Sequence, residues 1–526
     1  MKEFQLPLPA LISLLIVVGS GAISQINAHD FTIEEATIEE IQRAFADERL
    51  TSRMLVDFYL KQIEALTPML RSVVEVNPEA RDEADEADRR WREANVNWLP
   101  VGGLDGVPVL VKDTIVTKDK MNTTAGSYAL VGSVVARDAG VVEKLRKAGA
   151  VILGKASLSE WYSFRALGVP NGWCARAGQG VNPYVASGET CGSSSGSAIS
   201  VAANMVAVSL GTETHGSILC PSDHNSVVGF KPTVGLTTRA GVIPIMSRHD
   251  TVGPIARTVS DAVYVLDAIV GFDSRDAEAT SQGSKFIPQG GYKQFLNPNG
   301  SSGKRIGVVR NPFADKFHSM QAFENHLHTL RQKGAVIVDH LEIADIDIIL
   351  SSKRSGELTV MLAEFKLLLN DYLKELIGSP VRSLADVIAF NNKHAELEKI
   401  KEYGQATFIQ SKKTNGFGKK EKKAIETMAN LSRNGFEKLM RENELDAIVT
   451  LGSGCVSVLA IGGYPGITVP AGYGKDDGLP FGICFGGLKG TEPKLIEIAY
   501  AFEQATMMRR PPFHNSMDYQ ISHSGF

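Results

Sequence analysis

The stretch GTETHGSILCPS, residues 211–222, lies close after CGSSSGSA, residues 191–198, and both are crowded with glycine and hydroxyl side chains. Loops of this composition can cradle phosphate, relieve close packing, or present a serine nucleophile beside backbone N–H groups that stabilise an oxyanion. The Walker pattern of phosphate-binding loops and the GxSxG elbow of many hydrolases are both missing. Ser217 stands among consecutive N–H groups in a glycine-bearing turn, which is a suitable place for a nucleophile.

The composition is that of an ordinary globular protein. The chain has 526 residues, of which 43% are hydrophobic and 22% charged, and its formal net charge is −4. A basic excess would point to nucleic acid and an acidic excess to disorder, and this chain has neither. We therefore expect a large globular core and no nucleic-acid partner.

The N-terminal residues predict a secretory signal peptide. Their densest apolar run is Leu11–Val18, and small residues lead from it to a cleavage-like INA that ends at Ala28. This run is short for a membrane span, which needs ~20 residues, although an uncleaved anchor is the alternative. We expect no stable membrane insertion after cleavage. The predicted divisions are a signal peptide, one large main domain and a C-terminal tail: 1–28, 29–515 and 516–526.

Three N-glycosylation sequons agree with secretion, although such triplets also arise by chance. They begin at Asn122, Asn299 and Asn430. We therefore expect a glycoprotein of the secretory pathway, either secreted or held in an endomembrane lumen.

The cysteines are odd in number and form no CxxC pair, so a metal site and a disulfide framework are both unfavoured. They are Cys174, Cys191, Cys220, Cys455 and Cys484. One disulfide, between Cys174 and either Cys191 or Cys220, stays open as an alternative.

The order of patterns along the first half is typical of an α/β fold. Residues 31–95 predict helix, with a capping box in TIEE at 37–40. Alternating valines at 107–111 predict a strand. The run AGVVEKLRKAGAVILGKAS, beginning at Ala139, then predicts a helix, a glycine stop and a buried strand. The run SAISVAANMVAVSLGT, beginning at Ser197, predicts a buried helix that leads into another strand.

The second half repeats this mixture around a long helical region at about 352–445. Strands are predicted in KRIGVVRN, GAVIVDH, DAIVTLG, GITVPAG and PFGICFGG, and a closing helix in EPKLIEIAYAFEQAT. The segment ELTVMLAEFKLLLNDYL, at 357–373, fits either a core helix or a lid over a pocket, and core packing is the more common use. The basic run at 411–424 is interpreted as a solvated loop and helix face.

Lys112 is the first candidate for chemistry. It ends the apolar strand VPVLVK, on the strand face opposite Val109 and Val111. Burial disfavours the charged ammonium and lowers its pKa, which makes such a lysine a candidate proton acceptor. The alternative is a structural lysine that reaches solvent or pairs with Asp113.

The set of motifs resembles the amidase signature family of serine hydrolases. The resemblance is carried by VKDTIVT, GSSSGSA, GTETHGSILCPS, VVGFKPTVGL, DTVGPIARTVSDAVYVLDAIVG, GYPGITVPAG, PFGICFGG and IAYAFEQAT, and it covers nearly all of residues 31–510. It implies that the main domain is one large α/β/α amidase domain with a central mixed, twisted sheet covered by helices. It implies no metal or organic cofactor.

The resemblance also implies roles for individual residues. Ser217 matches the family's nucleophile, Ser193 the serine that relays a proton across a cis peptide bond, and Lys112 the neutral base. Ser193 and Ser217 are 24 positions apart, as in the family. This arrangement is physically coherent, because a serine hydroxyl needs a base within reach and a desolvated lysine can supply it without histidine.

Further residues around these three are expected to assist. The backbone amides of four successive residues resemble the family's oxyanion hole: Thr214, His215, Gly216 and Ser217. Ser194 and Asp113, which follow the relay serine and the lysine in the chain, are expected to support them.

Departures from the family's pattern concern the surroundings of the nucleophile. His215 stands where relatives commonly have Asp or Gly, so either only its backbone amide matters or its imidazole contacts the substrate and makes activity pH-dependent. Cys174 and Ala177 alter a neighbouring wall. Asp223 and His224 suggest a Ser-His-Asp triad, but neighbours in sequence usually point apart and the lysine relay is already complete.

We therefore predict an amidase that hydrolyses a carboxamide of a small molecule through an acyl-Ser217 intermediate. Acyl transfer to an amine or alcohol is a close variant that the residues do not separate from hydrolysis. Two different functions are also open: a catalytically silent binding protein of the same fold, and a glutaminase-type subunit of an amidotransferase. The first conflicts with the presence of the three catalytic residues, and the second with a signal peptide.

Overall fold

The computed structural model describes residues 31–97, 103–313 and 320–512. The described residues from Ile33 onward belong to one compact unit. The predicted signal peptide and tail, with both of their boundaries, lie outside the described residues. No helix in the described ranges is both long enough and apolar enough to cross a membrane.

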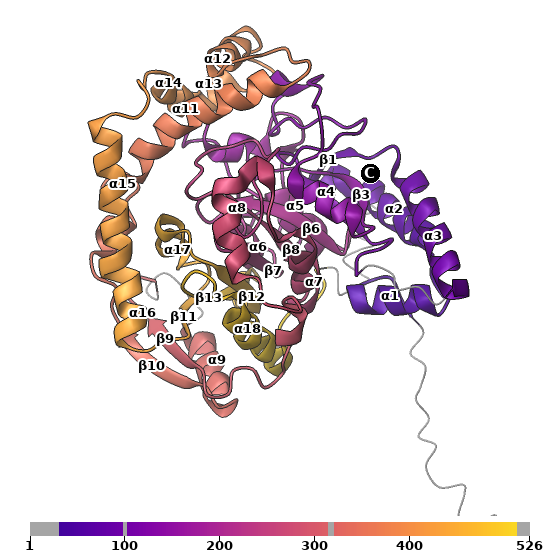
Figure 1. The fold of residues 1–526 in the computed structure, drawn as a ribbon, viewed down its shortest axis with the longest axis vertical. Coiled ribbons are helices and arrows are strands. Elements are labelled where there is room, and N and C mark those ends of the chain that lie inside the picture. The colour runs from indigo at the N-terminus through magenta and orange to yellow at the C-terminus, as the bar shows by residue number, and fades with distance from the viewer. Residues whose placement is uncertain (1–30, 98–102, 314–319, 513–526) are drawn as a thin grey trace, which may run out of the picture. The chain divides into compact units, whose positions relative to one another are not determined.

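The core of the molecule is one mixed sheet of eleven strands (Figure 1). Its strand order is β1-β3-β2-β6-β8-β7-β12-β13-β11-β9-β10. The strands are β1 Val73–Val76, β2 Pro108–Lys112, β3 Val151–Ala156, β6 Val208–Glu213, β7 Val228–Lys231, β8 Thr251–Ala256, β9 Arg305–Val309, β10 Val336–Leu341, β11 Ala447–Leu451, β12 Gly466–Tyr473 and β13 Pro480–Gly486. Two further short strands, β4 Trp173–Cys174 and β5 Gly178–Gln179, pair separately.

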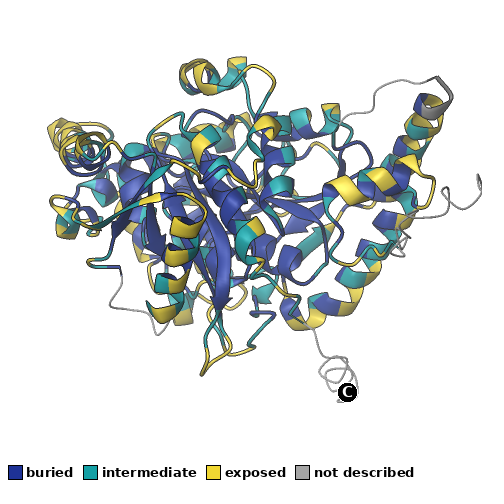
Figure 2. Cartoon of the chain, turned by 90° about the horizontal axis from the view of Figure 1, so that it is seen from below, coloured by how far each residue is buried: buried dark blue, intermediate teal, exposed yellow. Residues whose placement is uncertain are grey.

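The sheet has parallel strands on both sides of an antiparallel middle, and its edge strand β1 pairs antiparallel with β3. β2 runs parallel to β3 and β6, and β9 runs parallel to β10 and β11. The strands β8, β7, β12 and β13 between them pair antiparallel. Figure 2 shows the inner strands in the colour of buried residues, because helices cover both faces of the sheet, while the edge strands β1 and β10 are only partly buried. The predicted α/β class with a central mixed sheet is confirmed.

Helices form in the predicted regions and also in segments for which no helix is predicted, among them 277–283 and 320–332. They are α1 Ile38–Ala46, α2 Ser52–Leu70, α3 Ala80–Asn97, α4 Gly140–Lys147, α5 Ser195–Ala202, α6 Leu219–His224, α7 Val259–Ile269, α8 Ala277–Gly283, α9 Met320–Gln332, α10 Ile346–Ile349, α11 Glu357–Glu375, α12 Leu384–Lys393, α13 Ile400–Tyr403, α14 Ala406–Lys412, α15 Lys419–Ser432, α16 Lys438–Glu442, α17 Val456–Gly462 and α18 Glu492–Thr506. The predicted capping box before α1 is present, with Thr37 and Glu40 as its partners.

Some strands escape the sequence patterns. Residues 31–95, which predict uniform helix, contain the edge strand β1 between helices α2 and α3. β7 and β8 lie in the glycine- and proline-rich stretch, and β8 holds Pro254 in its middle. Both strands are buried on both faces, so they lack the alternation that marks a half-buried strand.

The helical region at 352–445 packs around its own hydrophobic cluster. In Figure 1, α11 to α15 lie together at the upper left, while α1 to α3 lie at the right. Along α11, Val360, Phe365, Leu369 and Leu373 are buried in that cluster. This supports the core interpretation of the segment 357–373, while the last turns of α11 also line a cavity described below.

Candidate active site

The sheet topology places the candidate site at the ends of two parallel neighbours, β2 and β6. The register pairs Val111 with Leu210, so the two strands end at the same edge of the sheet. Lys112 is the last residue of β2, and Glu213 is the last residue of β6. The nucleophile loop, defined here as residues 214–218, follows directly. Carboxyl ends of neighbouring parallel strands are the usual place for a site in an open α/β sheet.

The loop that carries Ser193 meets Lys112 from the start of α5. The Gly192–Ser193 peptide bond is cis. The Nζ atom of Lys112 lies 2.8 Å from Ser193 Oγ and 3.0 Å from Ser194 Oγ, and 3.3 Å from the carbonyl oxygen of Thr212. The structure therefore brings together three of the residues that the sequence singles out.

The hydrogen bonds of Ser194 determine which atom donates and which accepts in each contact of the Lys112 amine. Ser194 Oγ donates its single proton to the Thr212 carbonyl at 3.1 Å and accepts the Thr212 N–H at 3.2 Å. It can therefore only accept from Lys112. A neutral amine has two N–H donors, which Ser194 Oγ and the Thr212 carbonyl take up. The remaining lone pair of a neutral Lys112 then faces Ser193 Oγ.

Burial favours the neutral form of Lys112. Its side chain has no exposed surface, and this desolvation lowers the pKa of the amine well below its usual value. The negative charges of Glu213 and Asp250 act in the opposite direction but are outweighed. The ring of Tyr162 covers the amine, with Nζ 4.8 Å from the ring centroid.

Ser217 lies beside the Ser193 loop and is held by its neighbours. Its carbonyl oxygen accepts the Ser194 N–H at 3.1 Å, and the residue is 8% exposed. Glu213 Oε2 accepts the N–H groups of Ile218 and Leu219 at 2.7 and 3.0 Å. Glu213 thus ties the end of β6 to the start of α6 and fixes the turn between them. The sequence alone does not predict a role for Glu213, although this residue lies within the segment GTETHGSILCPS.

The four amides expected to form the oxyanion hole carry free donors. Within residues 31–97, 103–313 and 320–512, no group accepts a hydrogen bond from the backbone N–H of Thr214, His215, Gly216 or Ser217. Gly216 has φ +79°, a left-handed conformation that side chains disfavour. Adjacent donors without protein partners are what an oxyanion requires.

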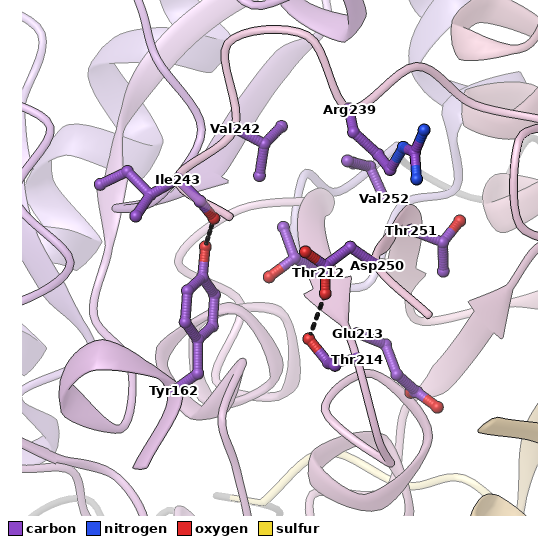
Figure 3. Close-up of a pocket in the computed structure, with 10 residues that line it drawn as sticks. All are labelled: Tyr162, Thr212, Glu213, Thr214, Arg239, Val242, Ile243, Asp250, Thr251 and Val252. Atoms are coloured by element: carbon purple, nitrogen blue, oxygen red, sulfur yellow. Dashed lines mark hydrogen bonds between the residues drawn. The ribbon is translucent and has the colours of Figure 1, made fainter. Parts of the chain in front are cut away.

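Thr214 is anchored on the other side of the loop. Its hydroxyl donates to Asp250 Oδ1 at 2.6 Å (Figure 3). Asp250 Oδ2 accepts two further N–H groups, from Ile245 and Met246. Figure 3 also shows the Tyr162 hydroxyl bonded to the carbonyl of Ile243. These contacts surround a small pocket behind the nucleophile loop.

A larger cavity of about 690 Å³ adjoins this small pocket. The two share Arg239, Val242 and Asp250, and the larger one reaches the last turns of α11 at Tyr372. Its walls carry both charged and apolar side chains. Its lining includes Asp250, which accepts the Thr214 hydroxyl, but none of residues 214–218 and neither Lys112 nor Ser193.

Asp113 stands apart from Lys112 despite being its neighbour in sequence. Its carboxylate accepts the N–H groups of Thr124 and Gly126, each at 3.1 Å, and the Thr124 hydroxyl. Burial raises the pKa of this carboxyl, although Arg176 acts against that. The pairing of Asp113 with Lys112, which is an alternative from sequence, is not formed.

The two histidines near the nucleophile have different surroundings. The ring of His215 lies between Glu357 and Ser457, which come from α11 and α17. Nδ1 of His224 lies 3.4 Å from the Glu189 carbonyl, at the surface. Asp223 accepts the N–H groups of Gly482 and Ser453. The Asp223 carboxylate is thus committed to backbone amides, which speaks against the Ser-His-Asp alternative.

The cysteines correct the expectation from sequence. Disulfides join Cys191 to Cys220 and Cys455 to Cys484, while Cys174 is free and buried. The first pair forms because the Ser193 and Ser217 loops converge, which sequence distance does not reveal. Among the described residues, Cys191, Cys220 and His224 are the only group of three metal-ligand types close together, but both sulfur atoms are committed to the disulfide.

The family of the chain follows from comparison with known proteins. The Amidase family model matches residues 54–455. The chain belongs to the amidase family. A protein of Arabidopsis thaliana named "Probable amidase" is 59% identical over 95% of this chain and 96% of its own length.

Two solved structures resemble this amidase along almost its whole length. Native peptide amidase from Stenotrophomonas maltophilia is 40% identical, with a TM-score of 0.85, over 93% of this chain and all of that one. A complex of peptide amidase with the competitive inhibitor chymostatin is 41% identical, also with a TM-score of 0.85, over 92% of this chain and all of that one. This amidase is therefore a hydrolase that acts on amides.

Proposed function

We propose that this amidase cleaves carboxamides through a covalent acyl-Ser217 intermediate, with Ser193 as proton relay and neutral Lys112 as base. The observation that carries the proposal is the contact of the Lys112 amine with Ser193 Oγ at 2.8 Å. All competing hydrogen bonds of that amine can be met by its two N–H donors, so its lone pair is left for Ser193.

The reaction then follows from these positions. Ser217 Oγ attacks the carbonyl carbon while its proton passes to Ser193 Oγ and the Ser193 proton passes to Lys112 Nζ. The carbonyl oxygen becomes an oxyanion, which the free amides of the nucleophile loop stabilise. The proton returns through Ser193 to the leaving nitrogen, and the C–N bond breaks. Water repeats the sequence on the ester and releases the carboxylic acid and free Ser217.

Peptide amides are the proposed substrate class. The main support is the likeness to the peptide amidase of Stenotrophomonas maltophilia. A cavity of about 690 Å³ that reaches Asp250, the partner of Thr214, adds room for a ligand. A cavity of this size lies within the roughly 300–1,000 Å³ of typical ligand sites. Its mixed lining suits a chain with both polar backbone and side chains.

The test is release of ammonia from peptides with a C-terminal carboxamide, followed by mass spectrometry of the acid product. Ser217→Ala, Ser193→Ala and Lys112→Met are expected to lose activity by at least ~10³-fold. Ser197→Ala is the matched control, since Ser197 is a buried serine of α5 whose hydroxyl bonds the Leu210 carbonyl. Tight binding of these peptides without any product would favour the silent binding protein instead. Preference for an added amine or alcohol over water as acyl acceptor, measured as the ratio of acylated product to acid, would favour acyl transfer.

We also propose that the protein matures in the secretory pathway. The Cys191–Cys220 bond supports this, because disulfides persist in oxidising compartments and are rare in the cytosol. Expression of the full chain in a eukaryotic cell tests it. Mature protein that begins after Ala28 and carries glycans is the expected result, and an intact, unglycosylated N-terminus in the cytosol would contradict it.

A further inference from the structure

His215 has a structural role that its backbone amide alone does not explain. Its Nδ1 lies 2.8 Å from Glu357 Oε1, at the start of α11, and its Nε2 lies 2.9 Å from Ser457 Oγ, in the first turn of α17. These partners are 142 and 242 positions away in the chain. The ring therefore ties the nucleophile loop to two elements that are remote in sequence.

The helix α17 also packs directly on this loop. A Cβ atom at Gly216 would lie 3.3 Å from the side chain of Val456, the residue before Ser457. The loop thus rests on α17 on one side and is tied to α11 by the ring of His215. Movement of either helix would change where the loop's free amides point.

The charges around the ring favour its protonated form. Glu357 is completely buried, and its carboxylate needs a nearby cation. The other titratable groups around the ring are Glu213 at the end of β6 and His249 before β8, whose Nδ1 lies 3.3 Å from the same Glu357 oxygen. Ser457, from α17, is uncharged.

The pKa shifts of His215 and Glu357 also favour a protonated ring beside an ionised carboxylate. Burial lowers the pKa of His215, but Glu357 and Glu213 outweigh it, so the pKa of the ring lies above its ordinary value. Burial raises the pKa of Glu357, but His215 and His249 outweigh it and hold that pKa well below its usual range. An imidazolium donates both N–H groups, one to Glu357 and one to Ser457 Oγ.

We propose that His215 is a positioning residue whose protonated ring, clamped between Glu357 and Ser457, holds the oxyanion amides of the nucleophile loop in place. The inference rests on the proposed function, since it concerns the same loop. Because the clamp needs the cation, it is intact at low pH and weakens as the pH rises through the pKa of His215. Catalysis therefore has an alkaline limit set by His215 and an acidic limit set by Lys112, which must be neutral.

The same contacts also fit a different role for His215, as the base of a catalytic triad, and the test must distinguish the two roles. A serine hydroxyl, a histidine and a buried carboxylate in this order form the arrangement of a Ser-His-acid triad. A neutral His215 would then activate Ser457 as a nucleophile. Ser457 is 7% exposed, so a reactive-serine probe decides whether it is reached.

The experiment is the pH profile of kcat and kcat/KM for His215→Gln, Glu357→Gln and the unmodified enzyme, with thermal unfolding as a check on folding. We expect His215→Gln to lose the alkaline limb and to lower kcat roughly 10- to 100-fold with little change in KM. We expect Glu357→Gln to move that limb to lower pH, because the ring loses its counter-charge. If His215→Gln does not fold, Glu357→Gln carries the test alone, since its amide preserves shape and a hydrogen bond.

Matched controls keep the result specific. Glu364→Gln changes another buried glutamate of α11, which bonds Arg248 and Ser247, and His328→Gln changes an exposed histidine of α9. Both are expected to keep the wild-type pH profile. An unchanged alkaline limb in His215→Gln and Glu357→Gln would overturn the clamp.

Labelling with a fluorophosphonate separates this inference from the proposed function. Label on Ser217 together with an unchanged alkaline limb would reject the clamp alone. No label on Ser217 in the unmodified enzyme would reject the serine mechanism and the clamp with it. Label on Ser457 that disappears in His215→Gln would replace the positioning role with a second nucleophile.

Discussion

Cys191 and Cys220 are joined by a disulfide, two residues before Ser193 and three residues after Ser217, with their Cα atoms 5.9 Å apart. The bond therefore closes a loop that contains both candidate catalytic serines. Together with the backbone bond from Ser194 to the Ser217 carbonyl, it fixes the two loops to each other. Such fixed geometry is what proton relay between two hydroxyls requires.

Removing this disulfide is expected to cost both stability and activity. The bond spans 29 positions, and a loop of that length contributes roughly 3–4 kcal/mol by restricting the unfolded chain. We expect Cys191→Ala/Cys220→Ala to lower the free energy of unfolding by up to about that amount. We further expect kcat per folded molecule to fall roughly 10-fold or more. Denaturant titration and kinetics on the same sample check both.

The second disulfide provides the matched control. Cys455 and Cys484 are also 29 positions apart, so their removal has the same expected effect on the unfolded chain. Its removal does not release the Ser193 loop, but Cys455 directly precedes α17, which packs on the nucleophile loop, so a smaller loss of kcat is expected there. Equal losses of activity in the two double variants would contradict a specific role for the Cys191–Cys220 bond.

Lys112 is expected to set the acidic limb of the activity profile. Its pKa is lowered by burial, so the amine is neutral at a lower pH than a free lysine, and activity rises with pH as the proton leaves. Lys112→Arg keeps a cation that cannot act as a base, and Lys112→Met keeps the bulk without the amine. We expect both to lose at least ~10³-fold in kcat in steady-state assays. Retained activity in Lys112→Arg would exclude the lysine as base.

The pH dependence of the unfolding free energy of Lys112→Met also tests whether the buried Lys112 amine is neutral in the folded protein. Between the lowered pKa of the folded state and the ordinary value of 10.5, the unfolded chain binds a proton that the folded chain does not. The free energy of unfolding therefore increases as the pH rises through that window and decreases as the pH falls. We expect the unfolding free energy of Lys112→Met to depend less on alkaline pH than that of the unmodified enzyme. An identical dependence would show that Lys112 is charged in the folded state.

Glu213 is expected to support catalysis by accepting hydrogen bonds that hold the end of the nucleophile loop. Glu213→Ala leaves the N–H groups of Ile218 and Leu219 without their partner, and kcat is expected to fall roughly 10²-fold. Glu213→Gln keeps a carbonyl oxygen and is expected to restore most of kcat. Both variants remove a negative charge that raises the pKa of Lys112, so both should shift the acidic limb to lower pH. Failure of Glu213→Gln to rescue kcat would argue against the structural role.

The sequons are expected to differ in whether they carry a glycan. Asn299 is exposed, whereas the Asn122 amide donates to Glu75 and its carbonyl accepts the Gly132 N–H. Glycopeptide mapping after eukaryotic expression should therefore find glycan on Asn299 and none on Asn122. A fully occupied Asn122 would show that this region is modified before it folds as described.

Local patterns are the part of the fold that the sequence predicts well. The helix-stop-strand run at 139–157 forms as predicted, because α4 has an apolar face and Gly149 takes φ +84° at its end. β7 and β8 escape prediction because they are short, buried on both faces and interrupted by glycine or proline. Their strand character comes from pairing with neighbours rather than from their own residues.

The same division holds within the site. Lys112, Ser193 and Ser217 lie in motifs that a sequence displays directly. Tyr162 and Glu357 reach the same place only through the fold, and nothing in their local sequence marks them. Asp113 follows the end of β2 and turns its carboxylate to the N–H groups of Thr124 and Gly126 rather than to the Lys112 amine, which its place in the sequence does not reveal.

The decisive test of the serine–serine–lysine mechanism is fluorophosphonate labelling of the mature protein, with the modified peptide identified by mass spectrometry. The probe forms a P–O bond to an activated serine and releases fluoride. We predict a single label on Ser217, strongest above the acidic limb and abolished in Lys112→Met. Label on another serine, or undiminished label on Ser217 in Lys112→Met, would contradict the serine–serine–lysine mechanism.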